Sequence, residues 1–275
     1  MKLLDIVDPN YPKIRKDERI KHVLDTLYKL RVDRVIVLKN SGDLYGIATE
    51  WDIFFKLSMI KREKYQPYNL PLSSVSTYPV DTLIPSADLK TAINMFMIKG
   101  YSSIPLVDDD NTIYGLLTKK DIIKTYLPYI ERLRLKAENI MREVKGKVEP
   151  FNSLKNVENK MRLGEYNTLI VHSNGKYLGV ITALDLAKTL FQIRKLHPTR
   201  EWNRYIERLS VIDILKKDIK TLGRDSHIYE ASELLAEGRQ KIVPIIDEDD
   251  KVVGLITRRH ILKIILDKIL RLKKF

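Results

Sequence analysis

The pattern of apolar and polar positions along the chain repeats four times. In each repeat, apolar residues at helical spacing are followed by a short apolar stretch, a polar turn, a second apolar stretch and another helical pattern. In the second repeat, Leu89, Ile93 and Phe96 fall on one helical face. We expect Ser86 to cap this helix and Gly100 to end it.

Short apolar strands are expected after the first helix of each repeat, at residues 35–38, 104–107, 168–171 and 242–246. An opening strand is clearest at residues 78–84 and 218–222. The predicted order is strand, helix, strand, strand, helix, which is a mixed α/β (α+β) class. A unit of about 60 residues cannot bury a large core alone, so neighbouring repeats should pack in pairs. The expected boundaries are 1–62, 63–128, 129–195 and 196–275.

A short motif marks the start of each closing helix: glycine, two apolar residues, threonine, two variable residues and an acid. It reads GIATEWD from Gly46, GLLTKKD from Gly115 and GVITALD from Gly179, whereas GLITRRH from Gly254 has histidine in the acid position. The glycines are 69, 64 and 75 residues apart (115 − 46, 179 − 115, 254 − 179). Such a period indicates repeated supersecondary units.

Two explanations fit threonine followed three residues later by aspartate. The first is a capping box, which stabilises a helix by about 1 kcal/mol and needs no ligand. The second is a binding site, because a helix N-terminus and a threonine hydroxyl can hold a phosphate while the carboxylate accepts both hydroxyls of a ribose. That combination fits adenosine phosphates, and the glycine would let a ligand approach the backbone closely.

The four motifs, each preceded by a predicted hairpin, resemble the CBS (cystathionine-β-synthase) domain family. The resemblance covers nearly the whole chain and implies four βαββα repeats packed as two tandem pairs, or Bateman modules. Four such repeats without a catalytic domain are similar in architecture to the gamma subunit of AMP-activated protein kinase. The resemblance implies a non-catalytic regulatory protein that binds AMP, ADP or ATP in clefts between paired repeats and signals to an effector protein by reorienting them. S-adenosylmethionine or methylthioadenosine is an alternative ligand, and no cofactor is required.

The resemblance also assigns roles to individual residues. The ribose acceptors are Asp52, Asp121 and Asp185. The phosphate contacts are Thr49, Thr118, Thr182, Thr257, Lys119, Lys120, Arg258 and Arg259, although these four cations also fit a solvated helix start. The residues flanking the base are Ile84, Ser103, Ile104, Pro105, Val243 and Pro244. We expect the site of His260 to be degenerate, because a neutral imidazole makes one hydrogen bond to a ribose hydroxyl where a carboxylate makes two.

Charge leaves one alternative function open. The net charge of +13 attracts anions in general, and a lysine-rich solvated surface explains most of it. Residues 194–209 mix Arg and Lys with Trp202 and Tyr205, which predicts a nucleic-acid interface unless the two rings pack on a neighbouring repeat. We expect residues 191–211, with a break at Pro198, to lie outside the cores, and residues 127–144 to be helical.

The sequence has no motif typical of an enzyme, a metal site or a membrane protein. The chain has no cysteine, its 5 histidines stand apart, and no Ser/His/Asp order, glycine-rich phosphate loop or metal cluster occurs, so we expect neither an enzyme nor a metal site. The chain has no run of eighteen apolar residues, so no membrane span is predicted. We therefore expect a cytoplasmic protein without a membrane partner, and a homodimer is left open.

Overall fold

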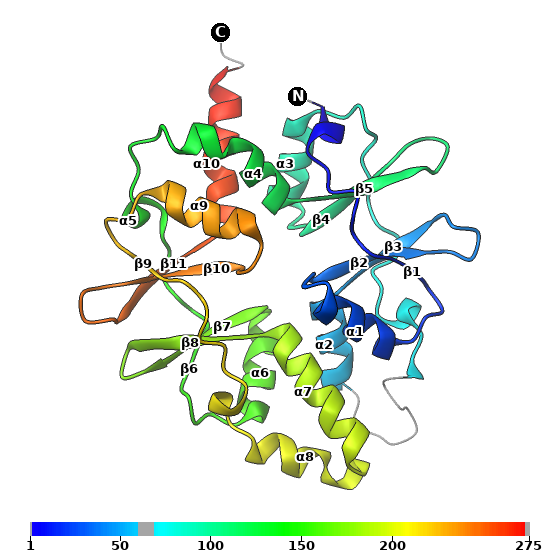
Figure 1. Ribbon diagram of the computed structural model, residues 1–275, viewed down its shortest axis with the longest axis vertical. Coiled ribbons are helices and arrows are strands. Elements are labelled where there is room, and N and C mark those ends of the chain that lie inside the picture. The colour runs from blue at the N-terminus through cyan, green and yellow to red at the C-terminus, as the bar shows by residue number, and fades with distance from the viewer. Residues whose placement is uncertain (1, 60–68, 273–275) are drawn as a thin grey trace. The chain divides into compact units, whose positions relative to one another are not determined.

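The chain divides into two compact units in the computed structural model, which describes residues 2–59 and 69–272 (Figure 1). Unit 1 is Met1–Tyr11, Val80–Glu143 and Lys220–Phe275, and unit 2 is Pro12–Pro79 and Val144–Ile219. Unit 1 therefore holds the second and fourth repeats, and unit 2 holds the first and third. No helix in the described parts of the chain has the length and apolar character needed to cross a membrane.

Unit 2 contains two three-stranded sheets, each made of an antiparallel hairpin with a short parallel strand at its edge. From the first repeat this unit takes β1 (Lys13–Arg15), α1 (Ile20–Lys29), β2 (Arg34–Leu38), β3 (Leu44–Thr49) and α2 (Glu50–Met59), together with η3 (Leu72–Ser74), which follows in the chain. From the third repeat it takes β6 (Lys147–Val148), α6 (Leu154–Gly164), β7 (Thr168–Ser173), β8 (Lys176–Thr182) and α7 (Ala183–Leu196), together with α8 (Thr199–Arg208) and η4 (Val211–Asp213), which follow in the chain.

Unit 1 is built from the other two repeats, with a two-stranded antiparallel sheet in the second and a three-stranded sheet in the fourth. From the second repeat it takes α3 (Leu89–Ile98), β4 (Ser103–Val107), β5 (Ile113–Thr118) and α4 (Lys119–Ile130), together with η1 (Leu3–Asp5) from the start of the chain. From the fourth it takes β9 (Leu222–Gly223), α9 (Ile228–Glu237), β10 (Ile242–Ile246), β11 (Val252–Thr257) and α10 (Arg258–Leu272), together with α5 (Ala137–Ile140), which lies earlier in the chain. The predicted strand at residues 78–84 is reduced to a single parallel bridge between Leu83 and Leu106. The mixed α/β class and the four repeats are confirmed.

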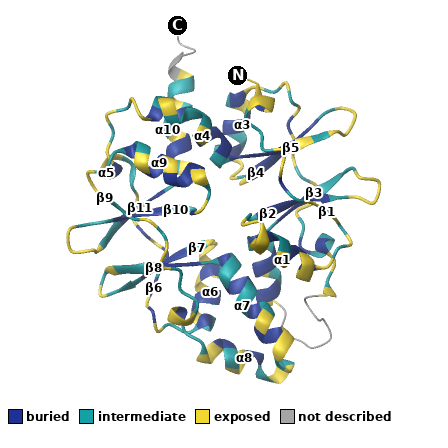
Figure 2. Cartoon of the chain, viewed as in Figure 1, coloured by how far each residue is buried: buried dark blue, intermediate teal, exposed yellow. Residues whose placement is uncertain are grey.

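Each hydrophobic core is shared by alternate repeats. In unit 1, α4 of the second repeat packs against α9 and α10 of the fourth, and in unit 2, α2 of the first packs against α7 of the third. Figure 2 shows buried residues on these helices and along the strands, and exposed residues at the hairpin tips. Within each unit, the repeat that completes a core is therefore two places along the chain, and not the next one.

Two local expectations are corrected. Asp88, and not Ser86, caps α3, because the Asp88 carboxylate accepts a hydrogen bond from the Thr91 N–H at 2.6 Å. Helix α3 does end before Gly100, which has a φ of +73° and so takes the left-handed conformation that glycine favours. Residues 127–144 are only partly helical, since α4 ends at Ile130 and α5 is a single turn.

The expectation that residues 191–211 lie outside the cores is wrong. Helix α8 begins after Pro198, as the predicted break indicates, but Trp202 and Ile206 are only 7% and 3% exposed and belong to the core of unit 2. Their spacing of four residues places both on one helical face. The Trp202 indole N–H also donates to the His197 carbonyl at 2.9 Å, which satisfies the polar atom of the buried ring.

Candidate functional site

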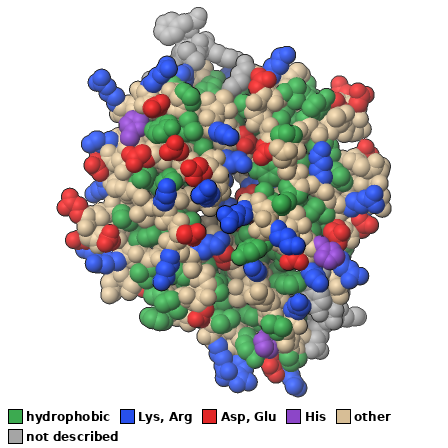
Figure 3. Space-filling model, viewed as in Figure 1, with side chains coloured by type: hydrophobic (Ala, Val, Ile, Leu, Met, Phe, Trp, Pro, Cys, Tyr) green, Lys and Arg blue, Asp and Glu red, His purple; other side chains and the backbone are tan. Residues whose placement is uncertain are grey.

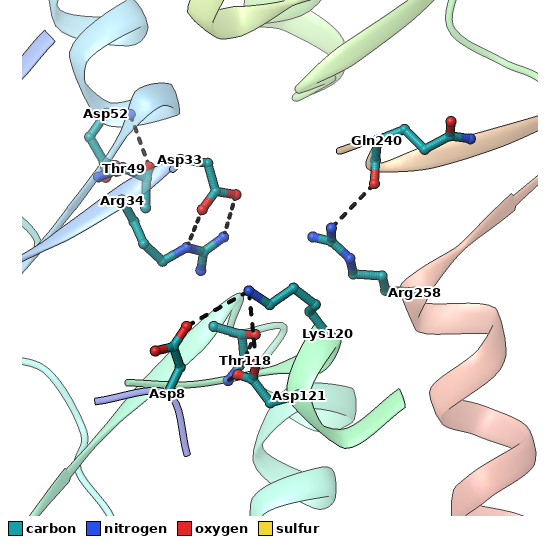
Figure 4. Close-up of polar contacts among 10 residues, drawn as sticks. All are labelled: Asp8, Asp33, Arg34, Thr49, Asp52, Thr118, Lys120, Asp121, Gln240 and Arg258. Carbon is teal, nitrogen blue, oxygen red and sulfur yellow. Dashed lines mark hydrogen bonds and ion pairs between the residues drawn. The ribbon is translucent and has the colours of Figure 1, made fainter. Parts of the chain in front are cut away.

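The threonine and aspartate of the second repeat form a buried cap at the start of α4. The backbone N–H and the hydroxyl of Thr118 donate to Asp121 Oδ2 at 2.8 and 2.7 Å (Figure 4). Both residues are buried, with Thr118 4% and Asp121 8% exposed. The capping explanation is thus realised in the structure, and it engages one carboxylate oxygen only.

The first and third repeats have the same geometry. Thr49 N and Oγ1 lie 2.7 and 2.6 Å from Asp52 Oδ2. Thr182 N and Oγ1 lie 3.1 and 2.5 Å from Asp185 Oδ2. The motif therefore sets a carboxylate against the first turn of a helix in three repeats, with the same oxygen accepting from threonine each time.

Burial shifts the pKa values of two of these acids. Desolvation raises the pKa of Asp52, although the hydrogen bonds from Thr49 and the nearby Arg34 guanidinium oppose the shift. Desolvation also raises the pKa of Asp121, against the opposing effects of Thr118 and Lys120. A carboxylate held in this way gains from any further donor that binds it, because its solvation by water has been reduced.

A residue from outside the hairpin lies beside each glycine motif, and no local pattern in the sequence identifies it. In every repeat, the second strand of the hairpin forms an isolated antiparallel bridge with a distant segment. We call the residues that make these contacts the bridge residues, in repeat order Thr77, Asp8, Lys216 and Arg142. They differ in charge, so they make the four motifs electrostatically different.

In three of the four repeats, the backbone of the bridge residue leaves room only for glycine in the motif. A Cβ atom on Gly115 would lie 2.4 Å from the Asp8 carbonyl oxygen, and one on Gly179 would lie 2.2 Å from the Lys216 carbonyl oxygen. Both glycines also have a positive φ, +150° and +151°. The expectation that the glycine admits a ligand is therefore corrected, because the chain's own backbone fills that space.

The predicted phosphate-binding cations take different positions. The Lys120 ammonium lies 3.9 Å from Asp8 Oδ2 and 4.0 Å from Asp121 Oδ1, next to the motif aspartate of its own repeat (Figure 4). The Lys119 ammonium lies 5.8 Å from the centroid of the Phe96 ring. Lys120 is thus the cation that the fold places at the acid.

The two arginines of the fourth repeat bind backbone carbonyls. Arg258 donates to the carbonyls of Leu235 and Gln240 at 3.0 and 3.2 Å, and so holds the end of α9. Arg259 donates to the Met97 carbonyl at 2.9 Å and ties α10 to α3 of the second repeat. These contacts give both arginines a structural role in unit 1.

The residues predicted to flank the base are split between surface and core. Ile84 is 49% exposed, whereas Ile104 and Val243 are fully buried in the core of unit 1. Ser103, Pro105 and Pro244 are buried as well. The side chains of Ile104 and Val243 face the core, which leaves Ile84 as the accessible member of the set.

His260 replaces the acid as a helix cap. Its Nδ1 accepts from the Thr257 N–H at 3.3 Å, and burial, with Arg142 and Arg259 nearby, lowers the pKa of the imidazole. The ring is therefore neutral at pH 7, and one of its two nitrogens is used by the cap. A cavity of about 320 Å³ beside it is lined by apolar side chains and by polar and charged ones: Asn139, Arg142, Arg259, Lys263 and Asp267.

The aromatic residues of the basic segment are engaged within unit 2. Trp202 is buried, and the Tyr205 ring stacks on His197 with centroids 3.6 Å apart. Figure 3 shows Lys and Arg interspersed with Asp and Glu over the face in view. The two rings therefore pack on the protein itself, which is the alternative to stacking on nucleic-acid bases.

Among the described residues, no group of three or more His, Asp or Glu side chains could hold a metal ion.

Four segments of the chain match the family model of the CBS domain: residues 4–58, 72–127, 137–192 and 211–267. The protein belongs to the CBS domain family and contains four CBS domains.

The chain is similar in sequence to the uncharacterized protein MJ1225 of Methanocaldococcus jannaschii. The two are 28% identical over 258 residues, covering 89% of this chain and 91% of that protein. The crystal structure of MJ1225, described as a candidate archaeal homologue of γ-AMPK, covers 96% of this chain and 100% of its own, with 26% identity and a TM-score of 0.84. A conserved protein from Pyrococcus horikoshii shares the fold at 19% identity and a TM-score of 0.61, covering 96% of this chain and 99% of its own.

Proposed function

We propose that the protein is a non-catalytic sensor of adenosine-containing ligands, with AMP, ADP and ATP as the leading candidates. The observation that carries the proposal is the threonine–aspartate pair repeated at three helix starts. In the first two repeats the aspartate accepts from threonine through Oδ2, while Oδ1 makes no described hydrogen bond. A ribose hydroxyl can donate to that second oxygen while the cap stays in place.

Phosphate recognition is proposed for the same helix starts. The first turn of a helix offers backbone N–H groups and the positive end of the helix dipole, both of which favour an anion. In the second repeat, the Lys120 ammonium lies within 4.0 Å of the ribose acid, where it can reach a phosphate attached to that ribose. In the fourth repeat, His260 supplies one acceptor to the cap, so we propose that this site does not bind a ribonucleotide in the same way.

The similarity to MJ1225, described as a candidate homologue of γ-AMPK, supports a regulatory role. A ligand that prefers one arrangement of the repeats shifts the population toward it, and a protein effector can read that shift. S-adenosylmethionine and methylthioadenosine remain the alternative ligands, because they present the same ribose to the aspartates.

Titration calorimetry with AMP, ATP and methylthioadenosine tests the proposal. We expect micromolar binding of at least one ligand, and Asp121→Asn to weaken binding at the site of the second repeat about tenfold, since a hydrogen bond to a charged acceptor contributes about 1.5–3 kcal/mol. Asp109→Asn removes the same charge from the exposed turn of the same repeat and should leave binding unchanged. Absence of binding by all three ligands would leave the motifs as helix caps.

Adenosine binding is expected to weaken on acidification. Burial raises the pKa values of Asp52 and Asp121 above 3.8, so these carboxyls take up protons at a higher pH than in the unfolded chain. A protonated carboxyl gains a donor and loses an acceptor, so it is a poorer partner for the ribose hydroxyl that donates to it. Titrations from about pH 7 down toward the ordinary aspartate pKa of about 3.9 should show the loss beginning at a higher pH than for an exposed aspartate.

The effect of the same two groups on stability has the opposite sign. Because their pKa values are higher in the folded chain, the folded state holds more protons in the window above 3.8, and their contribution to the free energy of unfolding falls as the pH rises through it. The double variant Asp52→Asn with Asp121→Asn should lack both trends. An unchanged pH dependence of unfolding in that variant would show that other groups cause it.

A further inference from the structure

Both oxygens of the third ribose acid are occupied by the protein itself. Asp185 Oδ2 accepts from Thr182, and the Lys216 ammonium lies 2.8 Å from Asp185 Oδ1. The second repeat differs, because Lys120 stays 4.0 Å from Asp121 Oδ1, beyond hydrogen-bond distance. In the first repeat, the bridge residue is Thr77, which carries no charge.

Lys216 is fixed at its backbone and free to move at its tip. Its backbone N–H donates to the Val180 carbonyl at 3.0 Å and its carbonyl accepts from the Val180 N–H at 2.9 Å. Its carbonyl also lies against Gly179, so the backbone of the segment cannot shift without breaking this bridge. The Lys216 side chain is 40% exposed, whereas that of Asp185 is 12% exposed. The ammonium can therefore leave the carboxylate for solvent while the rest of the bridge stays in place.

The third repeat also keeps an unused hydrogen-bonding group at the same place. Thr168 lies opposite Thr182 in the β7–β8 pair. Its hydroxyl oxygen is buried and has no hydrogen-bond partner among the described residues. A buried polar group without a partner is costly, which favours a ligand or water that supplies one.

From these contacts we infer that Lys216 is an internal latch on the third adenosine site. The inference rests on the proposed function. The Lys216 ammonium holds the carboxylate oxygen that a ribose hydroxyl needs, so a ligand must displace it. A phosphorylated ligand offers the displaced ammonium a new anionic partner, whereas adenosine offers none. The third site therefore selects nucleotides over nucleosides, and it does so through a residue outside the motif.

The test isolates the third site. The chain carrying Asp52→Asn and Asp121→Asn keeps only one of the three motif aspartates, Asp185. This chain serves as the background for further substitutions. Titration calorimetry with adenosine is expected to show about tenfold tighter binding after Lys216→Met, because no ion pair has to be broken. Lys216→Arg keeps the ion pair, and Lys217→Met removes an exposed neighbouring charge, so both should bind adenosine as the background does.

The preference for AMP over adenosine is the second readout. It should fall about tenfold in Lys216→Met and stay unchanged in Lys217→Met. Adenosine binding to the background chain should also tighten between about 0.05 and 0.5 M salt, because salt screens a partly exposed ion pair. This salt effect needs no substitution at Lys216, so it tests the latch even if Lys216→Met folds poorly.

The outcomes separate the latch from the function on which it rests. Adenosine and AMP failing to bind the unsubstituted chain would reject the proposed function and the latch with it. Binding to the unsubstituted chain, with equal or weaker adenosine binding after Lys216→Met, would reject the latch and leave the function standing. Loss of all binding in the background chain would also reject the latch, because Asp185 would then not form a site.

Discussion

Replacing Gly179 by alanine is expected to destabilise unit 2 by about 3 kcal/mol or more. The added Cβ would lie 2.2 Å from the Lys216 carbonyl oxygen and 2.8 Å from Leu215 Cδ1. The carbonyl cannot retreat without losing its hydrogen bond from Val180. Denaturant unfolding followed by tryptophan fluorescence measures the loss, because Trp51 and Trp202 both lie in unit 2.

Gly42→Ala is the matched control for this substitution. Gly42 lies in the same unit with a φ of +96°, but nothing lies within 4 Å of the position its Cβ would take. Only the cost of a left-handed alanine remains, about 1–2 kcal/mol. If the two variants were equally stable, the contact with the bridge residue would carry no weight and backbone conformation alone would explain the glycine.

Local signals in the sequence predicted the local parts of the site. The motif located Thr118 and Asp121 at the start of a helix, and the apolar stretches located the hairpin before it, because caps and strand patterns depend on residues close in the chain. The bridge residues could not be found in this way. Asp8 lies more than a hundred residues before Gly115, and no local pattern connects them. The glycine inside a strand did signal a close backbone approach, but not which segment approaches.

The periodicity of apolar residues does not predict which repeats share a core. An apolar helical face shows that something covers it, but alternate and adjacent repeats fit equally well. The same limit explains the error at residues 191–211, where charge and a proline suggested an outlying insertion. The four-residue spacing of Trp202 and Ile206 was the available sign that this segment joins a core.

Leu235→Ala in the fourth repeat is expected to destabilise the second repeat as well as its own, by about 2–5 kcal/mol. Leu235 is fully buried in α9, which packs against α4 of the second repeat. Ile104 and Leu106 on β4 belong to the same core. Truncating Leu235 therefore leaves a cavity that both repeats line, and unfolding of either exposes the other.

Native-state hydrogen exchange measures this coupling strand by strand. The amides of β4 in the second repeat should lose as much protection free energy as those of β10 in the fourth, because one cooperative unit contains both. Ile98→Ala provides the control: this residue lies in the second repeat itself but is 82% exposed, so its truncation should cost within about 0.5 kcal/mol. Loss of protection confined to β10 would show that each repeat keeps a core of its own, against the shared core of unit 1. Equal loss in β4 and β10 would mean that a change in the fourth repeat reaches the acid of the second through packing, since β5 pairs with β4 and leads directly into Thr118 and Asp121.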